Sequence, residues 1–226
     1  MIDSIKNRKQ EGVYFLLGIV GTIILFAAAY VIVMKNLPLS DFAFLTAGSI
    51  SMYLLFGLDS LKSLFTKPRM PFRNIVVTFI CLIMMASLGA TIIHFLNIPV
   101  TDNPIESDAA LAHPIMTVIG LFPALLGEEF IGVVSFLIVA NLADRANANQ
   151  TLSIIIGLIV SALIFGALHI ETYRGNLVQA IILIGSLRLP LTCSILKSNS
   201  IYTGWITHFV YDAGFFIAGV IAIGMQ

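Results

Sequence analysis

Charged residues are scarce in this chain. Only 11% of its 226 residues are Asp, Glu, Lys or Arg, while 58% are hydrophobic, whereas soluble domains carry about 25% charged residues. This composition excludes an ordinary soluble domain, because no soluble core could bury so many apolar side chains. The twelve basic residues balance the twelve acidic ones, so the net charge gives no reason to expect a nucleic-acid partner.

Cysteine is almost absent as well. Cys81 and Cys193 each lie inside an apolar stretch. Isolated cysteines in such settings are more often small buried hydrophobic residues than a disulfide or a metal pair. We therefore infer nothing about a redox compartment from them.

What the chain does contain is long apolar runs. A helix needs about 20 apolar residues to cross a bilayer, and unbroken runs favour helices over barrel strands, which alternate over about ten positions. The sequence predicts an all-α, polytopic transmembrane helical bundle that forms one domain over residues 1–226. About seven spans are expected, within a range of six to eight, at 13–34, 42–56, 75–98, 114–142, 152–170, 177–196 and 201–224.

Two of these stretches are irregular. The second is short and contains glycine, and the fourth is long and contains Pro123. Proline and length mismatch are common causes of kinks and tilts in membrane helices. We therefore expect at least one kinked or tilted helix.

Basic residues in short loops predict the orientation in the membrane, because Lys and Arg are enriched on the cytoplasmic side. The first run is too long for a signal peptide and is expected to be a retained first helix. The acidic connection 99–113, with Asp102, Glu106 and Asp108, suits the opposite side. We expect a multi-pass protein of the cell membrane, embedded in the lipid bilayer, with a cytoplasmic amino terminus. The basic residues that set this orientation are Lys6, Arg8, Lys9, Lys62, Lys67, Arg69 and Arg73.

Several ionisable residues lie inside the predicted spans, where each costs about 2.5 to 3.5 kcal/mol on insertion scales. Such groups are expected to face the bundle interior, find partners and mark a functional site. They are Glu128, Glu129, His169, Arg188, His208 and Asp212.

The spacing of these residues groups them. Glu128 and Glu129 are adjacent, and two neighbouring carboxylates in a low dielectric cannot both ionise at low cost, which suits a general acid or base. His208 and Asp212 are four residues apart and share one helix face. His169 ends the run SALIFGALH, with Phe165 one turn earlier on the same face.

Carboxylates and imidazoles together can activate water and stabilise an oxyanion, as hydrolysis of an acyl bond requires. This chemistry needs no cofactor. The same residue types, here Glu128, His169 and His208, could instead hold Zn2+ or another divalent metal. The HExxH motif is absent, and ligands on separate helices cannot be recognised by spacing, so both possibilities stay open.

Three motifs in order resemble the CAAX-protease and bacteriocin-processing family, also called the Abi family. They are Glu128-Glu129, the F-x-x-x-H from Phe165 to His169 and the H-x-x-x-D from His208 to Asp212. The similarity covers roughly residues 114–212, within an expected core of about 114–224. The stretch HIETYRGNLVQAIILIGSLR is also similar to the form found in Gram-positive bacteria.

The resemblance implies an intramembrane peptidase. The positions that match Glu128 and His169 would activate water, and those that match His208 and Asp212 would stabilise the oxyanion. Bacterial members are associated with maturation of peptide pheromones and bacteriocins, with self-immunity and with control of sensor kinases. We therefore expect a membrane-associated peptide or protein as substrate, processed as a leader rather than as a prenylated protein.

The chain departs from the family pattern at two positions. Val133 stands where the pattern E-E-x-x-x-R has arginine, and we hypothesise that Arg188 supplies the missing charge to Glu129 from another helix. Asp212 stands where Asn is common, and a carboxylate repels an oxyanion. We expect Asp212 to orient His208 instead.

Two alternative functions remain open at this stage. The fold could act as a non-catalytic partner that regulates a sensor kinase or an immunity target, or as a small proton-coupled transporter, although no internal repeat supports the latter. There is also a geometric difficulty. A simple seven-span count keeps Glu128, His169 and His208 apart, so convergence requires a tilted or broken segment between Ile170 and Gly204, such as a re-entrant piece around Pro190.

Overall fold

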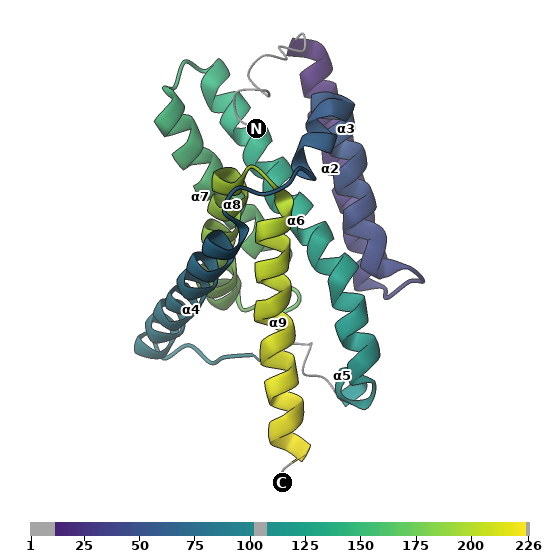
Figure 1. Cartoon of the computed structure of the whole chain (residues 1–226), viewed down its shortest axis with the longest axis vertical. Helices are drawn as coiled ribbons and strands as arrows, with labels where there is room; N and C mark the ends of the chain where they lie inside the picture. Colours follow the sequence, from purple (N-terminus) through teal and green to yellow (C-terminus); the bar gives the residue numbers. More distant parts are fainter. Residues whose placement is uncertain (1–11, 102–107, 225–226) are drawn as a thin grey trace.

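The computed structural model describes residues 12–101 and 108–224 of the chain. Within these ranges the protein is helical and contains no strand (Figure 1). Seven of its helices are long and apolar enough to cross a membrane. The prediction of an all-α polytopic bundle with seven spans is therefore confirmed, and the chain is a multi-pass membrane protein. The basic residues Lys6, Arg8 and Lys9 and the acidic residues Asp102 and Glu106 lie outside the described residues.

The spans correspond to the predicted apolar runs, with shifted ends. The sixth consists of a π-helical part, η3, followed by α8. Two helices are short: η1 (Ser40–Phe42) begins the second span, and α5 (Asp108–Ala112) lies between the third and fourth spans. The long elements are α2 (Gly12–Met34), α3 (Ala43–Leu64), α4 (Pro71–Phe95), α6 (Pro114–Arg145), α7 (Gln150–Leu168), η3 (Gln179–Gly185), α8 (Ser186–Ser198) and α9 (Ile201–Gly224).

The expected irregularity occurs in α3. Gly57 has φ 79° and ψ 170°, so it interrupts the helix at the end of the apolar run that predicted this span. Beyond Gly57 the helix continues through the polar residues Asp59 and Ser60 to Leu64. The predicted end at residue 56 was too early, because the helix outlasts its apolar segment.

Helix α6 is the centre of the bundle. It contacts α3, α7, α8 and α9, and Figure 1 shows it running obliquely through the middle of the molecule. Nearly every residue from Leu125 to Leu137 is buried. α2, in contrast, packs against α3 and η1. The middle of α6 is therefore the part of the chain best shielded from lipid, and Glu128 and Glu129 lie there.

The segment between Ile170 and Gly204 is broken, as convergence requires. A turn follows α7, in which Arg174 and Gly175 have positive φ, and the chain then forms η3. Pro190 in α8 has no N–H to donate to a carbonyl one turn earlier, and proline and π-bulges are both usual causes of helix distortion. The re-entrant piece suggested around Pro190 was wrong, because Pro190 lies within a continuous helical span from Gln179 to Ser198.

Candidate active site

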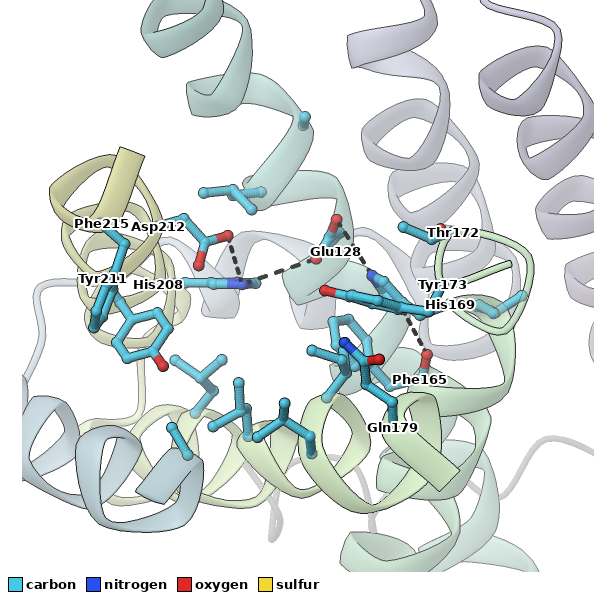
Figure 2. Close-up of a pocket in the computed structure, with 18 of the residues that line it drawn as sticks. Glu128, Phe165, His169, Thr172, Tyr173, Gln179, His208, Tyr211, Asp212 and Phe215 are labelled. Carbon is cyan, nitrogen blue, oxygen red and sulfur yellow. Dashed lines mark hydrogen bonds and ion pairs between the residues drawn. The ribbon is translucent and has the colours of Figure 1, made fainter. Parts of the chain in front are cut away.

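A cavity of about 750 Å³ lies between α2, α4, α6, α7, η3 and α9, within the size range of small-molecule and peptide pockets. Most of its lining is aliphatic or aromatic. Figure 2 shows polar groups from separate helices facing one another across this space. The polar residues that line the cavity include Glu128, His169, Tyr173, Gln179, His208, Tyr211 and Asp212.

Glu128 stands between two imidazoles. Its Oε1 lies 4.0 Å from His169 Nε2, and its Oε2 lies 3.9 Å from His208 Nε2. The side chain is 24% exposed and faces the cavity (Figure 2). These separations exceed a direct hydrogen bond, but they leave room for a group that contacts both sides, such as a water molecule.

His169 is held by the helix that precedes it. It caps the C-terminus of α7, and its Nδ1 lies 2.8 Å from the carbonyl oxygen of Phe165. Because a carbonyl only accepts, Nδ1 carries the proton and donates it to this bond. The rings of the two residues are 4.5 Å apart. The other ring nitrogen, Nε2, is thereby directed towards Glu128.

Behind Glu128 lies a buried chain of charged and polar groups. Arg188 on α8 forms a two-pronged pair with Glu129: Nη1 donates to Oε1 over 2.9 Å, and Nη2 bonds Oε2. The same Oε1 lies 2.8 Å from His208 Nδ1. The side chains of Glu129 and Arg188 are fully buried. Two-pronged arginine pairs fix geometry as well as charge, so this chain fixes the position of the His208 ring.

The hypothesis that Arg188 pairs with Glu129 is confirmed by these contacts. The guanidinium replaces the charge that Val133 cannot provide, and it also donates from Nε to the Thr192 hydroxyl over 3.1 Å. Glu129 therefore has a cation even though the family arginine is absent.

Two glycines make room for the buried pair. A Cβ added at Gly132 would lie 2.5 Å from Arg188 Nε, and one at Gly204 would lie 2.7 Å from Glu129 Oε2. Small residues are used in this way where membrane helices approach closely. α6 and α9 can therefore close around the ion pair only because these positions lack side chains.

The predicted contact between Asp212 and His208 is present, and an orienting role of Asp212 stays a prediction. Asp212 Oδ2 lies 3.5 Å from His208 Nε2, on the cavity side of the ring, and Glu129 forms the 2.8 Å hydrogen bond to the opposite nitrogen. The i to i+4 spacing brought the two residues close, as predicted. A carboxylate on a different helix has the better geometry, and spacing within one helix cannot reveal it.

Helix tilt and the turn after α7 bring together all the predicted site residues. Glu128 contacts neither imidazole directly, yet both lie within 4.0 Å of it, so the geometric difficulty raised by a simple span count does not arise. Phe165 packs between the two histidines, with ring centroids 4.5 Å from His169 and 6.5 Å from His208.

Several polar residues of the cavity escaped sequence reasoning, among them Tyr173, Gln179 and Tyr211. Gln179 is buried and binds the backbone of Thr101 twice: its Oε1 accepts from the N–H and its Nε2 donates to the carbonyl, both over 2.8 Å. Gln179 lies in an apolar run, and the cost of burying an amide could have identified it. The tyrosines carry no comparable signal.

The alternative metal site at Glu128, His169 and His208 stays a prediction. The two imidazole Nε2 atoms lie 4.0 and 3.9 Å from different oxygens of Glu128. Among the residues that the structure describes, no three His, Cys, Asp or Glu side chains form a group that could hold a metal ion. We therefore derive no chemical step through a metal.

The helices and the cavity together define a multi-pass membrane protein with an acid and imidazole pocket shielded from lipid. Residues 109–214, which contain this pocket's three motifs, match the family model described as type II CAAX prenyl endopeptidase Rce1-like. The match confirms the resemblance drawn from the motifs and is consistent with the CAAX-protease and bacteriocin-processing family of intramembrane proteases. No curated protein and no solved structure matches the chain. The family points to a peptidase.

Proposed function

We propose that this protein is an intramembrane endopeptidase in which Glu128 and His169 activate a water molecule to hydrolyse a peptide bond. One observation carries the proposal: the Glu128 carboxylate lies between two imidazole Nε2 atoms, at 4.0 and 3.9 Å, inside a largely apolar cavity. A peptidase needs a base for water, a donor for the oxyanion and an acid for the leaving amine. These three groups supply all of them.

The proposed reaction proceeds in two steps. Water between Glu128 and His169 loses a proton to Glu128, and its oxygen bonds the carbonyl carbon of the substrate, giving a tetrahedral oxyanion. Nε2–H of a doubly protonated His208 donates to that oxyanion, with Asp212 as a counter-ion 3.5 Å away. The C–N bond then breaks, and the proton held by Glu128 passes to the leaving nitrogen. The products are a carboxylic acid and an amine.

Glu129 and Arg188 have a supporting role in this proposal. Neither side chain is exposed to the cavity, so neither contacts the substrate. Their contribution is to hold the His208 ring with Nε2 directed at the reaction space, and positional errors of about 1 Å can cost about 10²-fold in rate. We therefore regard both as positioning residues.

The substrate that we favour is a membrane-associated peptide of the bacterial leader, pheromone or bacteriocin type. The mostly apolar cavity wall supports a substrate with apolar side chains around the cleaved bond. Processing of such a peptide, or immunity against it, fits the resemblance of the sequence to Gram-positive members of the family. Control of a sensor kinase would then follow from cleavage rather than from binding alone.

The test is cleavage of candidate leader peptides by the purified protein. Glu128→Gln removes the base and is expected to lower kcat/KM by about 10²- to 10⁴-fold. Glu171→Gln is the matched control, because Glu171 lies two residues beyond His169 and is not among the residues that line the cavity. Full activity of Glu128→Gln would reject the proposal. Inhibition of the wild type by a chelator would favour a metal mechanism instead.

A further inference from the structure

Basic residues gather at one end of the molecule. The α3–α4 connection meets the α8–α9 turn there, because the Arg69 N–H donates to the Ser198 carbonyl and the Thr66 hydroxyl donates to the Asn199 carbonyl, each over 2.9 Å. The chain runs in the same direction through α3 and α6, because Asp41 lies against Gly120 and Phe44 lies against Gly127. The C-terminal ends of α3 and α6 therefore lie at the same end of the molecule. This basic end carries Lys62, Lys67, Arg69, Arg73, Arg145 and Lys197.

The opposite end is poor in basic residues. α2 and α4 end there, α3 begins there, and the turn after α7 lies there too. Tyr30 near the end of α2 donates to Glu171 in that turn over 3.0 Å, and Asn176 in the same turn donates to the Pro99 carbonyl over 2.7 Å. Among the described residues, Lys35 and Arg174 are the basic side chains of this end.

The cavity opens towards this second end. Its lining includes Met34, the last residue of α2, and Phe44, near the start of α3. It also includes Val100 and Thr101 in the connection after α4, and Thr172 in the turn after α7. Val100 is 66% exposed, so the cavity meets solvent or headgroups at this end. On α6 the lining runs only from Leu121 to Ile131, in the half of the helix remote from Arg145.

The uneven distribution of basic residues sets the orientation in the membrane. Lys and Arg in short loops are retained on the cytoplasmic side, and neither the basic end nor the cavity end carries a long loop that would override this rule. Six basic residues lie at one end and two at the other in the described ranges. The basic end is therefore the cytoplasmic one.

We propose that the cavity opens to the extracytoplasmic face of the membrane. Given the proposed function, the bond that is cleaved belongs to a peptide or protein segment that reaches the site from that face, so export or insertion must precede cleavage. Asn176 and Gln179 hold the Pro99 and Thr101 backbone at this opening through their amides. A cytoplasmic substrate would meet the basic end, whose described basic residues do not line the cavity.

Labelling of single cysteines in intact bacterial cells tests the orientation without relying on activity. In a background of Cys81→Ala and Cys193→Ala, the cavity end is probed with Val100→Cys and Leu177→Cys, and the basic end with Lys67→Cys and Arg69→Cys. A membrane-impermeant maleimide is applied before and after permeabilisation. Within each pair, a cysteine position is scored only if its thiol reacts with the maleimide in permeabilised cells.

We expect the two cavity-end cysteines to react in intact cells and the two basic-end cysteines to react only after permeabilisation. The reverse pattern, labelling of both ends in intact cells, or labelling of neither end until permeabilisation would overturn the proposal. Because this experiment measures covalent labelling, its result does not depend on whether the protein cleaves a peptide. A protein that is labelled as expected but cleaves no peptide would contradict the proposed function and leave the orientation intact.

Discussion

His208 Nδ1 lies 2.8 Å from Glu129 Oε1, and this hydrogen bond joins the cavity to a buried ion pair with Arg188. The histidine therefore has one nitrogen fixed by α6 and the other facing Glu128 and Asp212. In the proposed mechanism, this arrangement separates the side chains that contact the substrate from the side chains that position them. The predictions below follow from this separation.

Removing Arg188 should destabilise the protein. Arg188→Met removes the fully buried guanidinium that binds both oxygens of Glu129, and breaking a buried pair costs about 3 to 5 kcal/mol. Combining it with Glu129→Gln neutralises both partners and should restore much of the free energy of unfolding, measured by denaturation in detergent micelles. Activity should stay low in the double variant, because His208 loses its carboxylate partner. Equal stability of the single and double variants would contradict this account.

Glu129→Gln alone should change kcat rather than KM. The amide keeps the shape of the carboxylate but weakens its bonds to Arg188 and His208, and Glu129 does not reach the cavity. Steady-state kinetics on a peptide substrate should show kcat lower by about 10- to 100-fold, in line with the cost of small positional errors. A raised KM with unchanged kcat would instead indicate that Glu129 binds substrate.

Gly132→Ala should lower both stability and activity. The added methyl would lie 2.5 Å from Arg188 Nε, so the guanidinium must move away from Glu129. Overpacking of this kind costs about 1 to 3 kcal/mol. Gly214→Ala in α9 is the control, because nothing lies within 4 Å of its added Cβ. Thermal unfolding of the two variants should separate them, and equal melting temperatures would argue against a tight site.

Asp212→Asn should be tolerated. Glu129 already holds His208, so the carboxylate of Asp212 is not required for orientation, and an amide can donate to the oxyanion where a carboxylate cannot. We expect kcat/KM within about tenfold of wild type, and a larger loss in Asp212→Ala. A loss in Asp212→Asn as severe as that in Glu128→Gln would show that the charge itself is needed.

The sequence predicted the helices well because apolar length is a strong signal in a membrane protein. The sequence did not predict that α3 continues beyond Gly57, because the helix is longer than its apolar run. It also did not predict the π-helical segment η3, because backbone geometry rather than composition determines that segment. The ionisable residues could be identified as site candidates from the sequence, because a charged side chain inside a membrane span costs free energy. The pairing of Arg188 with Glu129 was predictable from charge balance.

Apart from the Arg188–Glu129 pair, the sequence did not provide the relations between helices. Neighbouring residues on one helix suggested that Asp212 holds His208, but the shorter bond to His208 comes from Glu129 on α6. The span count placed His169 far from His208, because it ignored the tilt of the helices. Gln179 was overlooked because its partners, the N–H and carbonyl of Thr101, are backbone groups 78 positions away in the chain.

The most direct measurement is a double-mutant cycle on peptide cleavage by the purified protein, with Glu128→Gln, His169→Ala and both together. If the two side chains activate the same water, their effects are not independent, and the double variant should be about as slow as the slower single variant. Rate losses that simply multiply would mean that the two residues act separately. That result would contradict a shared water between Glu128 and His169.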